Sequence, residues 1–263
     1  MLIVGEKLNS TIPSVREAIK TRNAAFLQDL ARRQAAGGAG FLDLNTAHGN
    51  NELDDMEWAV QVLQEAIDVP LCIDSTEPAV MEAGLKAHRG KAMLNSISME
   101  TSRINGMLPL ISKYGCTVVA LTMDDSGIPK TAEERIKITG QLVDELKKAD
   151  VDLEQVYIDP LVLPLAVNSE NGVIFFHCLD EIKKSYKVKT ISGLSNVSHD
   201  MPKRKLINRN FLTICMAYGM DAAIMDPTDR KLTSAVTANN LLLNKDRFAR
   251  NYLKAFRTEA LED

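Results

Sequence analysis

Acidic and amide side chains follow nearly every short apolar run of this sequence, in positions where they could bind a small molecule. Asp74, Asn95, Asp159 and Asn196 each end an apolar run almost immediately. A single Asp or Asn at such a place is most simply explained as a helix cap, but this explanation weakens for the whole set. The full set has many acceptors and amides and few cations: Glu6, Asn9, Asp43, Asn45, Asp74, Asn95, Asp124, Asp159, Asn196 and Asp226.

These residue types argue against several kinds of chemistry. A phosphate site favours glycines and Lys or Arg after the last strands of a barrel, whereas the last apolar run ends in Met225-Asp226-Pro227. A Schiff-base enzyme needs a buried lysine at a strand end, but Lys189 lies at the start of a run. The four histidines occur singly, without metal-binding spacing, and no G-x-S-x-G sequence marks a nucleophilic serine. We therefore expect no metal site.

The ligand that remains is a neutral, planar molecule rich in hydrogen-bond donors. A carboxylate can accept two hydrogen bonds from an amino group beside a ring N–H, which is the edge that a pterin presents. The carboxamides of Asn95 and Asn196 can bind ring groups that both donate and accept. Sugars and other polyhydroxy or amide-bearing ligands fit the same residue types.

Eight short apolar runs, each followed by a longer amphipathic segment, must position these residues. Such alternation is typical of a parallel sheet covered by helices, and the runs lack a clear polar alternation, as doubly covered strands do. Eight units in about 250 residues predict a single-domain TIM (β/α)₈ barrel over residues 1–263. A doubly wound sheet is the alternative, but no G-x-G-x-x-G turn follows the first run. The predicted strands are Leu2–Gly5, Phe41–Leu44, Leu71–Ile73, Ala92–Leu94, Thr117–Thr122, Val156–Ile158, Thr190–Leu194 and Ala222–Met225.

Several segments between these runs carry helix signals. Asn23 and Thr76 are predicted N-caps, the latter just before Pro78, and Thr131 with Glu134 forms a predicted capping box. Apolar residues at helical spacing predict helices over 52–67 and over 107–114, the latter ending before Gly115.

Composition narrows the class of protein. The chain has a net charge of -4 and 45% hydrophobic residues, so it has no basic excess for binding nucleic acid. No apolar run approaches the ~20 residues of a membrane helix, and Glu6 and Lys7 interrupt any signal-peptide core. We therefore expect a cytoplasmic protein without a membrane partner. The cysteines are predicted to be reduced core residues: Cys72, Cys116, Cys178 and Cys215.

Several strand-end motifs, in the same order, resemble those of pterin-binding methyltransferases. The chain is most similar to the methyltetrahydrofolate:corrinoid/iron–sulfur protein methyltransferases, including the related enzymes of corrinoid-dependent demethylase systems. The similarity covers essentially the whole chain, from MLIVGEKLN and GGAGFLDLN to LINRNFL and GMDAAIMD. The motifs at the strand ends are LCIDST (Leu71–Thr76), AMLNSI (Ala92–Ile97), YIDPLVLP (Tyr157–Pro164) and GLSNVS (Gly193–Ser198).

The resemblance implies a barrel that binds tetrahydrofolate in its mouth, usually as a homodimer, and exchanges a methyl group with a corrinoid (cobalamin) carried by a partner protein. Asp74, Asn95 and Asp159 would hold the pterin, and Asn196 would hydrogen-bond near N5, which carries the methyl group of 5-methyltetrahydrofolate. Three other residues complete the implied site. Gly193 and Ser195 would shape the Asn196 loop, and Arg204 would lie beside the outer part of the ligand or the partner. His199 departs from the amide expected there, so it is a proton donor or a solvent-facing loop residue.

The implied reaction makes Asn196 the candidate catalytic residue. Breaking the bond from N5 to the methyl group requires a proton or a strong hydrogen bond at N5, because an amine is a poor leaving group. Two alternatives stay open. One is a folate-binding barrel without turnover. The other is a dihydropteroate synthase-like enzyme, which would be expected to carry a basic motif after the eighth strand. Cobalamin-dependent methionine synthases resemble the chain only in their folate domain.

Overall fold

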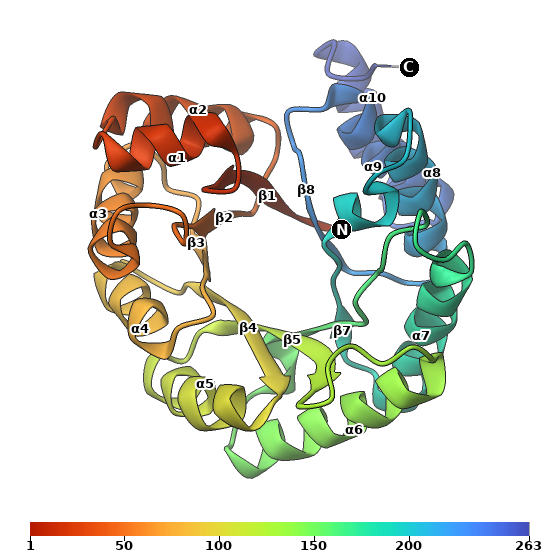
Figure 1. The fold of residues 1–263 in the computed structure, drawn as a ribbon. Coiled ribbons are helices and arrows are strands. Elements are labelled where there is room, and N and C mark those ends of the chain that lie inside the picture. The colour runs from red at the N-terminus through yellow and green to blue at the C-terminus, as the bar shows by residue number, and fades with distance from the viewer. Residues whose placement is uncertain (263) are drawn as a thin grey trace.

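The computed structural model describes residues 1–262, which form a barrel of eight parallel strands surrounded by helices (Figure 1). This architecture confirms the predicted (β/α)₈ class, and all eight predicted strands are present. The strands are β1 (Leu2–Asn9), β2 (Phe41–Asn45), β3 (Leu71–Asp74), β4 (Met93–Met99), β5 (Thr117–Asp124), β6 (Val156–Asp159), β7 (Lys189–Thr190) and β8 (Ala222–Met225).

The helices of the described residues lie outside the strands and cover them (Figure 1). The α-helices are α1 (Pro13–Lys20), α2 (Ala24–Ala36), α3 (Glu52–Gln64), α4 (Pro78–Ala87), α5 (Thr101–Tyr114), α6 (Ala132–Lys148), α7 (Asn171–Tyr186), α8 (Arg204–Ala217), α9 (Arg230–Leu242) and α10 (Arg250–Arg257). Short 3₁₀ helices are η1 (Leu153–Gln155), η2 (Leu194–Ser198) and η3 (Arg247–Ala249).

The helix signals in the sequence are mostly confirmed. Asn23 accepts a hydrogen bond from the Phe26 amide, and Thr131 forms a capping box with Glu134. The left-handed Gly115 ends α5, a conformation that glycine adopts at little cost.

Two helix boundaries differ from the prediction. Helix α4 is preceded by Glu77 rather than by a Thr76 cap, because Pro78 already takes the first position. Helix α3 ends at Gln64, three residues before the predicted Ile67.

Side-chain alternation along the strands places the polar residues at one end of the barrel. Apolar residues from distant strands pack against each other, which is possible only inside the barrel: Val4, Cys72, Met93, Val119, Ile191 and Ala222. Because side chains alternate along a strand, a residue two positions beyond an inward-facing one also faces inward. Asp74 follows Cys72 in this way, and Asn95 follows Met93.

The barrel closes between β7 and β8 through a loop rather than a full ladder. The predicted strand Thr190–Leu194 is correct only at Thr190, because β7 ends at that residue and Leu194 begins η2. Gly193 forms an isolated parallel bridge with Ile224, and the Ile224 amide donates to the carbonyl of Ser192 at 2.8 Å. The chain turns at Gly193, so η2 lies over the mouth.

Two further expectations concern the environment of the chain. Within residues 1–262, none of the helices is both long and apolar enough to cross a membrane. All four cysteines are free and buried, as predicted.

Candidate active site

A cavity of about 340 Å³ lies at the carboxyl ends of the strands. Five residues of the predicted site line it: Asp74, Asn95, Gly193, Ser195 and Asn196. The barrel thus brings together side chains that are up to 122 positions apart, the separation of 74 from 196. Glu6, Lys7, Asn9, Thr11, Ile12, Asp43 and Ile224 complete the lining.

The carboxylates and amides on the floor of this cavity are paired across β2, β3 and β4. Asn95 donates from Nδ2 to Oδ1 of Asp43 at 3.0 Å. Asn45 donates from Nδ2 to Oδ2 of Asp74 at 3.1 Å, and its own Oδ1 accepts from the Ser10 hydroxyl at 2.9 Å. Because each amide donates to a carboxylate, the orientation of the amides is set before any ligand arrives.

Burial makes two of these carboxyl groups weak acids. Burial and the nearby Asp43 raise the pKa of Asp74 to about 8. Burial also raises the pKa of Asp43 to about 6, although the hydrogen bond from Asn95 opposes the shift. At neutral pH Asp74 therefore holds a proton much of the time, and the mouth carries less negative charge than its residue types suggest.

Asp159, also a predicted site residue, does not line this cavity and is almost fully buried. Its Oδ1 accepts a hydrogen bond from the Leu161 amide at 2.7 Å, and its Oδ2 accepts from the Gly193 amide at 3.4 Å. Burial raises the pKa of Asp159 to about 6, against these two hydrogen bonds. Asp159 thus connects the end of β6 to the loop that carries Asn196.

The Asn196 side chain is exposed to the cavity and forms no hydrogen bond with any described residue. Its Nδ2 lies 3.0 Å from the point where a side chain at Gly193 would begin. Gly193 has a φ of -69°, which any residue can adopt. The glycine therefore matters for the space that it leaves to Asn196.

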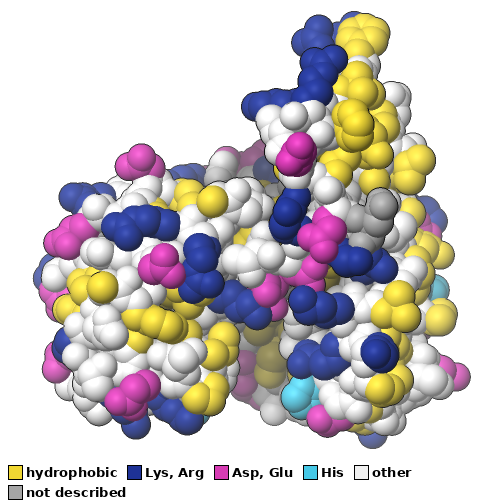
Figure 2. All heavy atoms as spheres, turned by 90° about the horizontal axis from the view of Figure 1, so that it is seen from above, with side chains coloured by type: hydrophobic (Ala, Val, Ile, Leu, Met, Phe, Trp, Pro, Cys, Tyr) yellow, Lys and Arg dark blue, Asp and Glu magenta, His cyan; other side chains and the backbone are white. Residues whose placement is uncertain are grey.

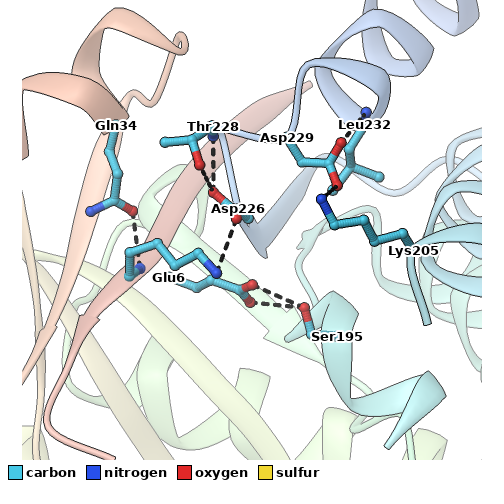
Figure 3. A network of polar contacts seen from close by, with 9 residues as sticks. Glu6, Gln34, Ser195, Lys205, Asp226, Thr228, Asp229 and Leu232 are labelled. Atoms are coloured by element: carbon cyan, nitrogen blue, oxygen red, sulfur yellow. Dashed lines mark hydrogen bonds and ion pairs between the residues drawn. The ribbon is translucent and has the colours of Figure 1, made fainter. Parts of the chain in front are cut away.

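Contacts from β1 and α8 hold the Asn196 loop in place. The Ser195 hydroxyl donates to the Glu6 carboxylate, 3.0 Å from both oxygens (Figure 3). Arg204 donates to the Ser195 carbonyl at 2.8 Å and to the Ser198 hydroxyl at 3.1 Å. Burial raises the pKa of Glu6, with the Ser195 hydrogen bond acting in the opposite direction.

The remaining predicted residues lie outside this cavity. Arg204 lines an adjoining cavity of about 290 Å³, which also contains Glu6, Lys7 and Ser195. His199 is exposed, with its Nε2 3.6 Å from the carboxylate of Asp200, and it lines neither cavity.

Sequence reasoning assigned no binding role to Glu6 or Asp43, although both were recognised as strand-end residues. The signal that could have found Asp43 is its spacing of two from Phe41, which packs against the barrel interior. No local signal in the sequence reveals the Glu6 contact with Ser195, because 189 positions separate them. Among residues 1–262, no group of three His, Cys, Asp or Glu side chains is placed to hold a metal ion.

Comparison with protein families places this barrel among known enzymes. Residues 5–226 match the family of pterin binding enzymes. The chain is 39% identical over 261 residues to the methylcorrinoid:tetrahydrofolate methyltransferase of Eubacterium limosum, covering 98% of this chain and 96% of that protein. It is 31% identical over 240 residues to the methionine synthase of Mycobacterium tuberculosis, but spans only 20% of that much longer protein.

Solved structures share the fold at low sequence identity. A dihydropteroate synthase of Yersinia pestis with a pterine-sulfa conjugate superimposes with a TM-score of 0.68 at 19% identity, covering 93% of this chain and 94% of that one. The Xanthomonas albilineans dihydropteroate synthase in complex with 7,8-dihydropteroate gives a TM-score of 0.69 at 16% identity, covering 94% and 93%. The family match over residues 5–226 and the full-length similarity together show that the chain belongs to the pterin-binding enzyme family.

Proposed function

We propose that this protein is a methyltransferase that moves a methyl group between N5 of tetrahydrofolate and the cobalt of a corrinoid held by a partner protein. The observation that carries this function is the 39% identity to a methylcorrinoid:tetrahydrofolate methyltransferase over nearly the full length of both chains. The cavity supports it, because its carboxyl and carboxamide groups suit the edge of a pterin.

The pterin ring is held by Asp74, Asn95 and Asp159. Carboxylates of Asp74 and Asp159 accept hydrogen bonds from the amino group and ring N–H, while Asn95 contributes an amide whose Nδ2 is already oriented by Asp43. Such preorganised pairs lower the entropic cost of positioning the ligand. The shallow cavity leaves N5 open to a large corrinoid partner.

Asn196 acts at N5 itself. When methyltetrahydrofolate is the donor, the bond from N5 to the methyl carbon breaks and its electron pair stays on N5, which takes a proton from solvent. The partner's corrinoid in its Co(I) state would supply the electron pair of the new bond to the methyl carbon, and its cobalt would become Co(III). An amide donor at Asn196 stabilises the charge that develops on N5. In the reverse direction the N5 lone pair forms the new bond, and the proton on N5 is lost to solvent.

The other predicted residues hold Asn196 in place for this step. Gly193 leaves room for the Asn196 amide, while Ser195 and Arg204 fix the backbone of η2. His199 is exposed on the same loop, so we assign it to the surface that meets the corrinoid partner.

The site does not favour a dihydropteroate synthase reaction. Asp226 follows β8, where a pyrophosphate leaving group would need cations. Hydrogen bonds from Thr228 and Lys7 hold the pKa of Asp226 below its usual range, although partial burial acts to raise it. Asp226 is therefore ionised at neutral pH, so the residues directly after β8 present carboxylates rather than a basic motif.

A spectroscopic assay tests the function against a binding barrel without turnover. Protein is mixed with methylcob(III)alamin and tetrahydrofolate without oxygen, and the cobalt absorption bands are followed. We expect conversion to cob(I)alamin with formation of 5-methyltetrahydrofolate. Tight folate binding with no change in either direction of reaction would instead establish the binding barrel.

We also assign the whole chain to one pterin-binding domain in the cytoplasm that forms a homodimer. The dimer is supported by large exposed apolar side chains on the last helices, since such patches often mark interfaces. Light scattering should give twice the 29.0 kDa chain mass. Ile214→Glu should shift the measured mass to that of the monomer, whereas Leu53→Glu should not. The exposed apolar residues in this part of the chain include Ile214, Tyr218, Leu242, Leu253 and Phe256.

A further inference from the structure

One arginine of the chain lies inside the protein, although arginine is usually a surface residue. Figure 2 shows Lys and Arg side chains at the surface, with Asp and Glu among them. Arg135, near the start of α6, is only 1% exposed. Because taking a charged group out of water is costly unless the group is paired, the burial of Arg135 requires a physical explanation.

Backbone carbonyls, and not carboxylates, surround the charge of Arg135. Within residues 1–262 its guanidinium forms no ion pair, and its Nη2 has no hydrogen-bond partner. Its Nε donates to the carbonyl of Pro129 at 2.9 Å, in the loop between β5 and α6. Its Nη1 donates to the carbonyls of Pro160 at 3.1 Å and Leu161 at 2.8 Å, directly after β6. An apolar side chain would fill the space at lower cost, so the contacts with these two loops distinguish the arginine.

One peptide group connects Arg135 to Asp159. The carbonyl of Pro160 and the amide of Leu161 belong to the same peptide bond. The carbonyl accepts from Arg135, and the amide donates to Oδ1 of Asp159 at 2.7 Å. A positive charge at the carbonyl end polarises the peptide group and strengthens the hydrogen bond that its amide donates. Arg135 therefore acts on the Asp159 carboxylate through this peptide group.

The turn after β6 has a backbone conformation that its residues do not favour. Leu161 has a φ of 61°, in the left-handed region that residues with a Cβ atom disfavour. Pro160 has no amide hydrogen, so Leu161 supplies the first backbone donor after Asp159. Because Nη1 of Arg135 donates to the carbonyl on each side of Leu161, the guanidinium holds this residue in its strained conformation.

The orientation of Asp159 depends on the backbone around it. Its carboxylate accepts hydrogen bonds from the amides of Leu161 and Gly193, and the residue is only 6% exposed. Burial raises the pKa of Asp159 to about 6, while these two amides and the charge of Arg135 act in the opposite direction. A change in the turn after β6 would therefore move one of the two donors that hold the carboxylate.

We propose that Arg135 is a positioning residue for the pterin, which holds the turn at Pro160 and Leu161 and thereby keeps the Asp159 carboxylate in the orientation that binds the ring. This inference rests on the proposed function, because that function assigns Asp159 to the pterin. Lysine keeps the positive charge but lacks the planar set of donors that reaches several carbonyls at once. Arg135→Lys therefore tests orientation separately from charge.

Hydrogen exchange of the ligand-free protein tests the hold on the turn. The wild-type Leu161 amide should exchange far more slowly than in an unfolded chain, because it donates to a buried carboxylate. In Arg135→Lys it should exchange about tenfold faster relative to the Ile158 amide of β6, the usual effect of weakening one hydrogen bond. Equal acceleration of both amides would contradict the proposal. So would exchange of the wild-type Leu161 amide at the unfolded rate, which needs no variant to fold.

Calorimetry measures whether the turn affects the folate. Arg135→Lys should weaken 5-methyltetrahydrofolate binding by about tenfold, since the acceptor for the ring is no longer oriented. The control is Leu142→Ala, which leaves a cavity two turns further along the buried face of α6 and destabilises the fold. The control should bind folate like wild type. An equal loss of affinity in both variants would mean that stability alone causes it, and would contradict the role of Arg135.

A double-mutant cycle tests whether Arg135 acts through Asp159. In an Asp159→Ala protein, Arg135→Lys should change folate affinity by less than about twofold, because the carboxylate that it orients is absent. A tenfold loss in both backgrounds would overturn the proposal. Wild-type protein that binds no folate would overturn the proposed function, and with it this role. Undiminished folate binding by Arg135→Lys would overturn only the role of Arg135.

Discussion

Asn95 donates a hydrogen bond to Asp43 at 3.0 Å, across 52 positions of sequence, while Asp74 stands in register with Asn95 on the neighbouring strand. This relationship gives the site two properties at once. The amide is held in one orientation, and two carboxyl groups are brought close enough for one to raise the pKa of the other. The floor of the cavity is thus arranged for hydrogen bonding but is electrostatically strained when both acids ionise.

The first prediction concerns stability and pH. The pKa of Asp74 is about 8 in the folded chain and about 3.9 in the unfolded one. Between these two pH values the folded state keeps a proton on Asp74 that the unfolded state has lost. Protonation of Asp74 therefore stabilises the folded state at low pH, and this stabilisation is lost as the pH rises to 8. Asp74→Asn removes the ionisation and keeps an acceptor for Asn45.

The gain in melting temperature from Asp74→Asn should therefore be larger at pH 8.5 than at pH 5.5. We expect the gain to grow by at least about 2–4 °C, which corresponds to about 1 kcal/mol for a domain of this size. Thermal melts of both proteins at several pH values test this. A gain that is constant across the range would contradict the shifted pKa.

The second prediction concerns folate affinity. Asp74→Asn should weaken 5-methyltetrahydrofolate binding by roughly tenfold or more, because a charge-assisted acceptor contributes about 1.5–3 kcal/mol. Wild-type protein should release protons on binding at pH 7, since the ligand's donors favour the ionised carboxylate. Calorimetry in buffers of different ionisation enthalpy measures both.

The control for this variant is Asp124→Asn. Asp124 also lies at a strand end, but its carboxylate accepts hydrogen bonds from Ser126 and does not line the cavity. The Asp124→Asn variant should bind 5-methyltetrahydrofolate with the affinity of wild type. An equal loss of affinity in both variants would refute the role of Asp74.

The third prediction concerns turnover. Asn196→Ala should keep most of the folate affinity and lower the rate of methyl transfer by roughly 100-fold, the usual cost of losing one transition-state donor. The measurement is the rate of cobalt band change with saturating folate. Asn210→Ala, at an exposed position of α8, should react at the wild-type rate. Rapid turnover by the Asn196 variant would show that N5 needs no donor there.

The fourth prediction concerns the space beside Asn196. In Gly193→Ala the new carbon would lie 3.0 Å from Asn196 Nδ2, so the amide must move by a few tenths of an ångström. The backbone is not strained, because φ is -69°. We expect kcat to fall roughly three- to tenfold, equivalent to about 1 kcal/mol of barrier, while KM for folate changes little. A fall in folate affinity with unchanged kcat would point to the pterin pocket instead.

Local patterns in the sequence were sufficient for much of the fold. Short apolar runs predicted eight strands, Thr131 and Glu134 predicted the start of α6, and Asp74 was placed correctly at the end of β3. Asn95 was also predicted at a strand end, but it lies within β4, which continues to Met99. These features depend on neighbouring residues and on the two-residue alternation of a strand. Both can be recognised in the sequence alone. The length of β7 was beyond such reasoning, because Gly193 leaves the ladder to form a tertiary bridge with Ile224.

Only the tertiary structure decided which residues meet and how acidic they are. The contact between Glu6 and Ser195 joins the first strand to the loop after the seventh, and exists because the barrel closes. The pKa of Asp74 depends on burial and on the nearby Asp43, neither of which is a property of adjacent residues. The residue types therefore specify what can bind, and the closed barrel determines their charge, orientation and partners.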